Sequence, residues 1–199
     1  MKRLLLSVLL LIQIPVTLGQ RLETNIQWLL SNLTKSSRIE QATLKVFSPS
    51  NTIDISIQYP LENDLDSISP QPFYTASIGK MFTAVSIAIL HERGYLDFDD
   101  KISEYLSNET MKNLLQVNKH SYGHLITISH LLQHKSGLAD YFEDETFTGE
   151  PKLIDQLFIN PNKVWKEKEI LQFYKHHLKG KFKPGTSYHY TDTAYLLLG

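Results

Sequence analysis

Residues 77–93 form the segment that most constrains the fold of this chain. The stretch SIGKMFTAVSIAILHER has the spacing of a helix, and its apolar residues cover most of the helix circumference rather than a single stripe. A helix that is apolar nearly all round must be covered by other elements, so we expect it to lie inside a domain. Gly94 follows at the position where helices commonly end.

Shorter elements flank this helix in the sequence. Apolar residues on one face predict a helix at 24–35, with Thr24 as its N-cap. Alternating apolar residues around 44–46 and 53–57 predict two strands joined by a Ser-Pro-Ser-Asn turn. A turn followed by a short helix is predicted at 97–106. Three further helices are predicted at 127–134, where Thr127 is the N-cap, at 166–178 and at 193–198.

The composition is ordinary for a globular protein and excludes some classes of function. The 199 residues are 42% hydrophobic and 21% charged, which argues against disorder. The net charge is −1 and no basic stripe runs along the chain, so we expect no nucleic-acid partner. There is no cysteine, hence no disulfide framework.

The first nineteen residues have the features of a secretory signal peptide. Lys2 and Arg3 precede a short apolar run, and small or polar residues follow near Gly19. The alternative is an uncleaved membrane anchor, which the shortness of the run and its interruption by Gln13 and Pro15 disfavour. We therefore expect a leader at 1–19, a mature chain at 20–199 without a membrane span, and a secreted or periplasmic location.

The C-terminal residues predict that the sequence is the N-terminal portion of a larger domain. Residues 193–199 are apolar and end without a polar tail, and such a run normally packs against something further along the chain. The predicted strands occur only near the front, and two strands make a poor sheet on their own. Both features favour a missing C-terminal part.

Ser77 and Lys80 are the first candidate catalytic residues. Their spacing of three places them on one helical face, one turn apart. Free backbone N–H groups at the first turn of a helix can stabilise an oxyanion, and a lysine desolvated by apolar neighbours can lose its proton more readily. These are the requirements of an activated serine nucleophile. A Ser-x-x-Lys pattern is also expected about once by chance in a chain of this length, so the pattern alone is weak.

Three segments in order strengthen that hypothesis. The stretch at 73–106 (FYTASIGKMF and onward), ITISHLLQHKSGL at 126–138 and FKPGTSYHYTDTAYLLLG at 182–199 resemble segments of the serine β-lactamase and penicillin-binding protein superfamily. Within it they resemble the class C β-lactamase and D-alanyl-D-alanine carboxypeptidase-like group, and the resemblance covers most of 40–199. It implies an α+β fold of the β-lactamase/transpeptidase type, with a mixed antiparallel sheet flanked by helices beside an all-helical subdomain.

The resemblance also implies roles for individual residues. Ser77 would be the acylated nucleophile and Lys80 would help to deprotonate it. Tyr190 matches the tyrosine of a Tyr-x-Asn motif and would shuttle a proton between Ser77 and the leaving group. Asp192 stands where the family has asparagine, a substrate-binding position. An ionised aspartate cannot donate a hydrogen bond, and its charge would favour protonated Lys80, which shifts more of the base role toward Tyr190.

Other patterns are weaker candidates. The family's third motif, Lys/His-Thr/Ser-Gly, should follow the tyrosine motif, and nothing follows it here; the Lys-Ser-Gly at 135–137 precedes Tyr190 and is interpreted as a turn. Tyr95-Leu96-Asp97 also matches Tyr-x-Asp and is interpreted as structural. His130 and His134 have the spacing to share a metal ion, but no third ligand stands at a recognisable spacing, so a packing role for His134 is favoured.

The sequence therefore predicts an exported serine hydrolase that acts through an acyl-enzyme. Its substrate would be a small molecule or peptide, such as a β-lactam, a D-amino-acid peptide or an ester, and no metal or organic cofactor is implied. The alternative is a catalytically inactive chain that binds cell-wall peptides. The oligomeric state is not predicted.

Overall fold

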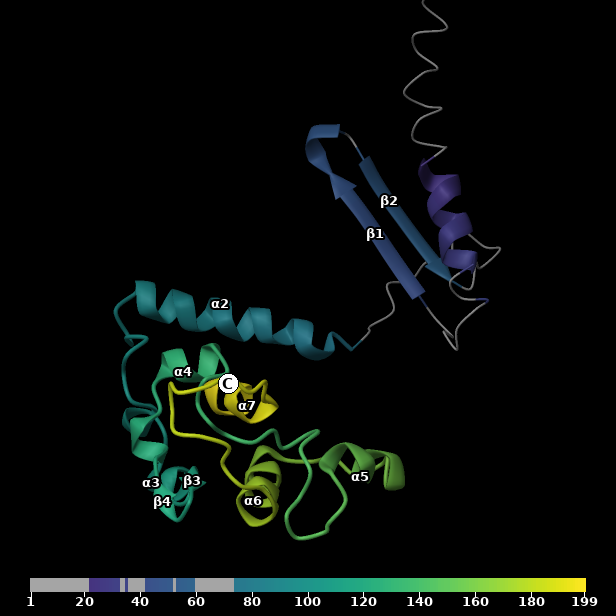
Figure 1. The fold of residues 1–199 in the computed structure, drawn as a ribbon. Coiled ribbons are helices and arrows are strands. Elements are labelled where there is room, and N and C mark those ends of the chain that lie inside the picture. Colours follow the sequence, from purple (N-terminus) through teal and green to yellow (C-terminus); the bar gives the residue numbers. More distant parts are fainter. Residues whose placement is uncertain (1–21, 33–34, 36–41, 52, 60–73) are drawn as a thin grey trace, which may run out of the picture. The chain divides into compact units, whose positions relative to one another are not determined.

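The computed structural model describes residues 22–32, 35, 42–51, 53–59 and 74–199. It divides into two units, Met1–Phe73 and Tyr74–Gly199, which are described separately (Figure 1). The predicted leader at 1–19 lies outside the described residues. Within them, no helix combines the length and the apolar character needed to cross a bilayer.

The first unit contains a helix and a β-hairpin. Strands β1 (Ala42–Ser48) and β2 (Ile53–Tyr59) pair antiparallel across a 3-10 turn at Pro49–Asn51, with Val46 opposite Ile55. The two predicted strands are therefore confirmed. Lys45 points to the other face, where it pairs with Asp54 of β2. Residues 22–32 are helical, so Thr24 lies inside this helix and its prediction as the N-cap was wrong.

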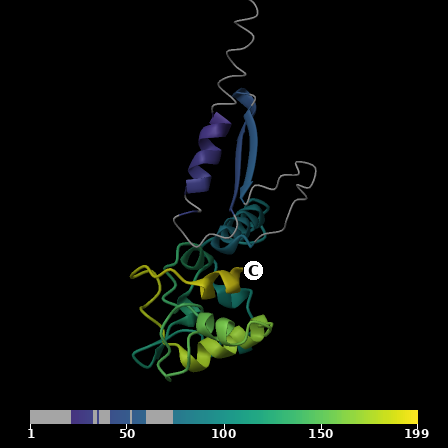
Figure 2. The same ribbon diagram turned by 90° about the vertical axis from the view of Figure 1, so that its right-hand side faces the viewer.

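The second unit is mostly helical, and α7 (Asp192–Leu198) lies among three other helices. It contacts α2 (Gly79–Glu92), α4 (Ile128–Leu132) and α6 (Glu167–His177). Figure 1 shows α2 passing over α4 and α7, and Figure 2 shows the same grouping from the side. The last helix of the chain thus meets the helix that carries the Ser-x-x-Lys pattern.

Helix α2 is less buried than the sequence predicted. Ile87 is buried, whereas other apolar side chains of the helix remain exposed in the described structure, Phe82 by 67% of its surface. The packing that α2 makes with α7 covers only part of its circumference. Gly94 follows the helix with a φ of +74°, a left-handed conformation that suits glycine and agrees with the predicted end.

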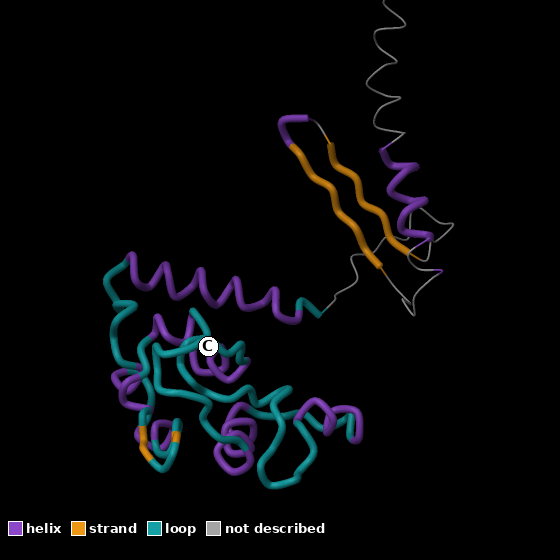
Figure 3. The backbone as a smooth tube through the Cα atoms, in the orientation of Figure 1, coloured by secondary structure: helices purple, strands orange, loops and turns teal. Residues whose placement is uncertain are grey.

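Several short elements were not predicted from the sequence. They are α3 (Asn108–Met111), the two-residue strands β3 (Gln116–Val117) and β4 (His120–Ser121), and α5 (Leu153–Ile159), and Figure 3 shows them among long loops. Elements of this length have little periodicity of their own, because tertiary packing stabilises them. Leu114 and Leu115, which lead into β3, are completely buried.

The core of the second unit gathers apolar side chains from nearly every helix. Its buried members are Ile87, Ile102, Leu114, Leu115, Ile126, Ile128, Leu131, Leu138, Ala139, Leu153, Phe173, Tyr174, Leu178 and Ala194. The one hydroxyl in this set is satisfied, because Tyr174 donates to the carbonyl of Leu114 at 2.8 Å. The core fixes α4 and α7, the two elements that lead into the candidate site.

Candidate active site

Ser77 lies in a 3-10 turn, Ala76–Ile78, that runs directly into α2. The residue before it, Ala76, has a φ of +46°, which is costly for a residue with a β-carbon. Lys80 stands one turn further along, and its Nζ lies 3.4 Å from Ser77 Oγ. The local geometry therefore places the two predicted residues, Ser77 and Lys80, in contact. It also shows a strained backbone at Ala76, which the sequence did not predict because alanine is not a residue type that indicates a positive φ.

Tyr190 reaches the same point from a distant part of the chain. Its hydroxyl donates a hydrogen bond to Ser77 Oγ at 2.8 Å, although 113 positions separate the two residues. Lys80 Nζ lies 4.9 Å from the centre of the Tyr190 ring. The structure thus brings Ser77, Lys80 and Tyr190 together, with Tyr190 partly exposed to solvent.

Asp192 also contacts the group, through an ion pair with Lys80. Both side chains are largely covered, with 17% of Lys80 and 23% of Asp192 exposed. Burial lowers the pKa of Lys80, but the hydrogen bonds and charges of Asp192 and Tyr190 outweigh it, so the Lys80 pKa lies above its ordinary value of 10.5. Desolvation acts on Lys80 in the expected direction but is outweighed, and the expectation that the charge of Asp192 favours protonated Lys80 agrees with this balance.

The His134 ring packs against the ring of Tyr190. Its ring centre lies 4.5 Å from that of Tyr190 and 5.2 Å from that of Tyr195, and its Nδ1 accepts the backbone N–H of Thr191 at 3.2 Å. Burial, and then the charge of Lys80, hold the pKa of His134 below its ordinary value. These contacts are those of a packing residue, as the sequence suggested.

A metal centre finds no support in the part of the chain that the structure describes. His130 Nδ1 accepts the backbone N–H of Thr127, which occupies one of its ring nitrogens. No cluster of histidine, cysteine, aspartate or glutamate suited to a metal ion occurs among the described residues.

The Lys-Ser-Gly stretch at 135–137 forms a turn after α4. Gly137 has a φ of +80°, and a β-carbon there would lie 2.0 Å from the carbonyl oxygen of Phe182. Ser136 is completely buried. The stretch packs against the segment that leads to Tyr190, since the backbone N–H of Lys181 donates to the Gly137 carbonyl at 2.8 Å.

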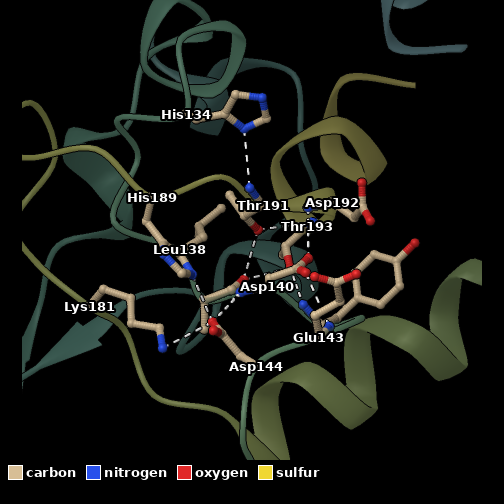
Figure 4. Close-up of polar contacts among 12 residues, drawn as sticks. His134, Leu138, Asp140, Glu143, Asp144, Lys181, His189, Thr191, Asp192 and Thr193 are labelled. Carbon is tan, nitrogen blue, oxygen red and sulfur yellow. Dashed lines mark hydrogen bonds and ion pairs between the residues drawn. The ribbon is translucent and has the colours of Figure 1, made fainter. Parts of the chain in front are cut away.

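A buried polar network that the sequence did not reveal holds residues 191–193. The hydroxyls of Thr191 and Thr193 donate to the carbonyl of Ala139, at 2.9 and 2.7 Å. The backbone N–H of Asp192 donates to Asp140 Oδ1 at 2.7 Å, and that of Tyr141 donates to Thr193 Oγ1 at 3.0 Å. Figure 4 shows these contacts converging at the start of α7. Because they join segments about fifty positions apart, no local pattern could indicate them.

Comparison with known proteins gives the family. Residues 71–199 match the family described as Beta-lactamase, and the chain belongs to that family. Penicillin-binding protein 4* of Bacillus subtilis (strain 168) is 30% identical over 129 residues, which are 63% of this chain and 23% of that protein.

Solved structures show similar folds. A D-stereospecific amidohydrolase from Streptomyces sp. is 28% identical with a TM-score of 0.52, over 64% of this chain and 35% of that one. D-amino acid amidase from Ochrobactrum anthropi SV3, complexed with L-phenylalanine amide, has a TM-score of 0.62 at 22% identity, over 90% of this chain and 45% of that one, and shows likeness of fold alone. The predicted superfamily and its α+β, β-lactamase/transpeptidase-like fold are therefore confirmed. The chain spans less than half the length of each of these relatives.

Proposed function

We propose that this protein is a serine hydrolase that acts by acyl transfer through an ester of Ser77. The observation that carries the proposal is the contact of Ser77 Oγ with both the Tyr190 hydroxyl, at 2.8 Å, and Lys80 Nζ, at 3.4 Å. A nucleophile within hydrogen-bond reach of a proton acceptor, itself oriented by a third group, is the arrangement that covalent catalysis needs. Membership of the beta-lactamase family supports the same class of reaction.

The chemistry follows from these contacts. Ser77 Oγ attacks the carbonyl carbon of an amide or ester, and its proton passes to the deprotonated oxygen of Tyr190. That proton then moves to the leaving nitrogen or oxygen, so an acyl ester of Ser77 and a free amine or alcohol result. Water gives a proton to Tyr190 as its oxygen attacks the ester carbonyl. Tyr190 then passes that proton to Ser77 Oγ as the bond to the acyl group breaks, so the acid leaves and both Ser77 and the deprotonated Tyr190 are restored.

Lys80 acts electrostatically in this reaction. Its pKa is raised by Asp192 and Tyr190 despite burial, so it carries a positive charge at neutral pH. A cation 4.9 Å from the Tyr190 ring stabilises negative charge on the phenol oxygen. Tyr190 is accordingly the proposed base, and Lys80 its charge partner.

The substrate proposal rests on the named relatives. A penicillin-binding protein and a D-stereospecific amidohydrolase are similar to this chain, which supports β-lactams and D-amino-acid amides or peptides as first substrates to try. Simple esters test the same chemistry with a better leaving group.

Loss of acylation in Ser77→Ala tests the proposal. The protein is incubated with a fluorescent penicillin and with an activated ester, and the covalent adduct is measured by intact mass. We expect an adduct that maps to Ser77 and disappears in Ser77→Ala. Ser86→Ala is the matched control, because Ser86 is an exposed serine on the same helix that hydrogen-bonds only the Phe82 carbonyl in the described contacts. An adduct that persists in Ser77→Ala contradicts the proposal.

A second candidate function is binding without turnover. Two observations favour it. The ion pair with Asp192 holds Lys80 as an ammonium that cannot accept the Ser77 proton, and the Tyr190 hydroxyl donates to Ser77 Oγ instead of accepting from it. In that case, the protein retains a D-amino-acid peptide in equilibrium binding measurements while intact mass shows no acyl adduct. Steady hydrolysis of any of the test substrates excludes this candidate.

Export is a separate proposal. Residues 1–19 have the basic start, short apolar run and small residues of a signal peptide. We expect the N-terminus of the protein recovered from the host to begin near residue 20 and the protein to lie outside the cytoplasm. An intact leader on protein from the cytoplasmic fraction contradicts this, and an intact leader on protein from the membrane fraction supports anchoring.

A further inference from the structure

We propose that Asp140 is a positioning residue that holds Asp192 against Lys80, an inference that rests on the proposed function for its effect on rate. Asp140 contacts none of Ser77, Lys80 or Tyr190 in the recorded hydrogen bonds and ion pairs of the described residues. It acts through the backbone of Asp192, which is the first residue of α7.

The carboxylate of Asp140 is buried and accepts hydrogen bonds from backbone N–H groups of two separate segments. Only 4% of the residue is exposed. Its Oδ1 accepts the N–H of Asp192 at 2.7 Å, and its Oδ2 accepts the N–H of Glu143 at 3.1 Å. A carboxylate is costly to bury unless such donors satisfy it, so both backbone segments are tied to one rigid group.

The backbone of Asp140 is in turn held by Asp144. Its backbone N–H donates to Asp144 Oδ2 at 2.7 Å. The same oxygen accepts Lys181 Nζ at 3.0 Å and His189 Nε2 at 2.8 Å, as Figure 4 shows. His189 lies one residue before Tyr190, so this anchor and the candidate proton carrier belong to one continuous segment.

The short side chain of Asp192 links the position of its backbone to its contact with Lys80. Only two rotatable bonds separate its carboxylate oxygens from the backbone, so fixing its N–H limits where those oxygens lie. Those oxygens form the ion pair with Lys80, whose Nζ lies 3.4 Å from Ser77 Oγ. Asp140 therefore acts on the Lys80 pKa without touching Lys80, because it orients the carboxylate of Asp192, one of the two groups that raise that pKa.

Two substitutions separate positioning from charge. Asp140→Ala removes the acceptor for the Asp192 N–H, whereas Asp140→Asn keeps an oxygen for that N–H, removes the charge and replaces the acceptor of the Glu143 N–H by an NH2 group. Asp155→Asn, at an exposed aspartate of α5, is the matched control for carboxylate loss. The titration of Lys80 is followed in each by the chemical shift of its 13C-labelled Cε, with Lys80→Arg assigning the signal, and acylation by an activated ester is timed in parallel.

Positioning predicts that the Lys80 pKa falls in Asp140→Ala and stays close to the starting value in Asp140→Asn and Asp155→Asn. Acylation should slow by about 10- to 100-fold in Asp140→Ala, the size of loss that follows a small misplacement of reacting groups. A Lys80 pKa in Asp140→Ala equal to that of the unsubstituted protein overturns the proposal. An equal fall in Asp140→Ala and Asp140→Asn also overturns it, in favour of a charge effect.

A measurement on the unsubstituted protein covers the case in which Asp140→Ala does not fold. Hydrogen exchange of the Asp192 amide should be strongly protected, and exchange at the rate of a free peptide overturns the proposal. If the unsubstituted protein forms no acyl adduct, the proposed function fails on its own. The Lys80 titration still decides the role of Asp140, since it needs no turnover.

Discussion

At the scale of single residues, Lys80 lies between two opposing influences. Burial lowers its pKa, and the contacts with Asp192 and Tyr190 raise it further than burial lowers it. The outcome depends on one side chain, because an asparagine in place of Asp192 would contribute a dipole but no charge. The identity of residue 192 therefore contributes to how far the Lys80 pKa lies above its ordinary value.

Asp192→Asn tests that dependence. Loss of the carboxylate removes an influence that raises the Lys80 pKa, so the pKa falls and neutral Lys80 appears at lower pH. Because the Lys80 ammonium is the charge partner of Tyr190, we expect the falling limb of the pH–rate profile for acylation to move to lower pH, with Asp155→Asn leaving it in place. If the profiles of the unsubstituted protein and of Asp192→Asn superimpose, Asp192 does not control the protonation of Lys80.

At the scale of elements, the short helix α4 depends on Thr127, the N-cap residue that precedes it. Thr127 Oγ1 accepts the backbone N–H of His130 at 3.1 Å, and His130 Nδ1 accepts the N–H of Thr127 in return. The predicted N-cap is confirmed. Helix α4 ends just before His134 and contacts α7. Loss of its N-cap should therefore disturb the packing of His134 against Tyr190.

Thr127→Ala should lower the free energy of unfolding by about 1 kcal/mol, the usual effect of removing an N-cap hydroxyl. Thr127→Ser keeps the hydroxyl and should retain most of the stability. Urea unfolding followed by circular dichroism measures both. A loss of the same size in Thr127→Ser would assign the effect to the methyl group instead of the cap.

At the scale of the whole molecule, the core of the second unit connects the elements that meet at Ser77. Leu131, on α4, is 1% exposed and belongs to that core. Truncation of a buried leucine costs both its transfer energy and a cavity. The stability of the site and the packing of the core are thus linked through one cluster.

Leu131→Ala is expected to lower the free energy of unfolding by about 2–5 kcal/mol. Val164→Ala is the control, since 82% of Val164 is exposed and its truncation should change stability by about 0.5 kcal/mol or less. Urea titration with Trp165 fluorescence, in a Trp28→Phe background, reports on this unit. Equal effects of the two substitutions would contradict the proposed position of Leu131 in the core.

The sequence by itself determined what depends on neighbouring residues. The strands at 42–48 and 53–59, the helices beginning near Gly79 and Glu167 and the cap of α4 follow from periodicity and local hydrogen bonding. The spacing of Ser77 and Lys80 is likewise a property of one helical turn. Short elements such as α3 and α5 escaped prediction because packing, rather than their own pattern, stabilises them.

Only the tertiary structure decided how distant residues act on one another. It brought the Tyr190 hydroxyl to Ser77 across 113 positions and joined Asp192 to Lys80 across 112. It also tied Asp192 to Asp140 across 52 positions. The protonation of Lys80 follows from these contacts, because burial and neighbouring charge are properties of the folded chain, and a sequence pattern specifies neither.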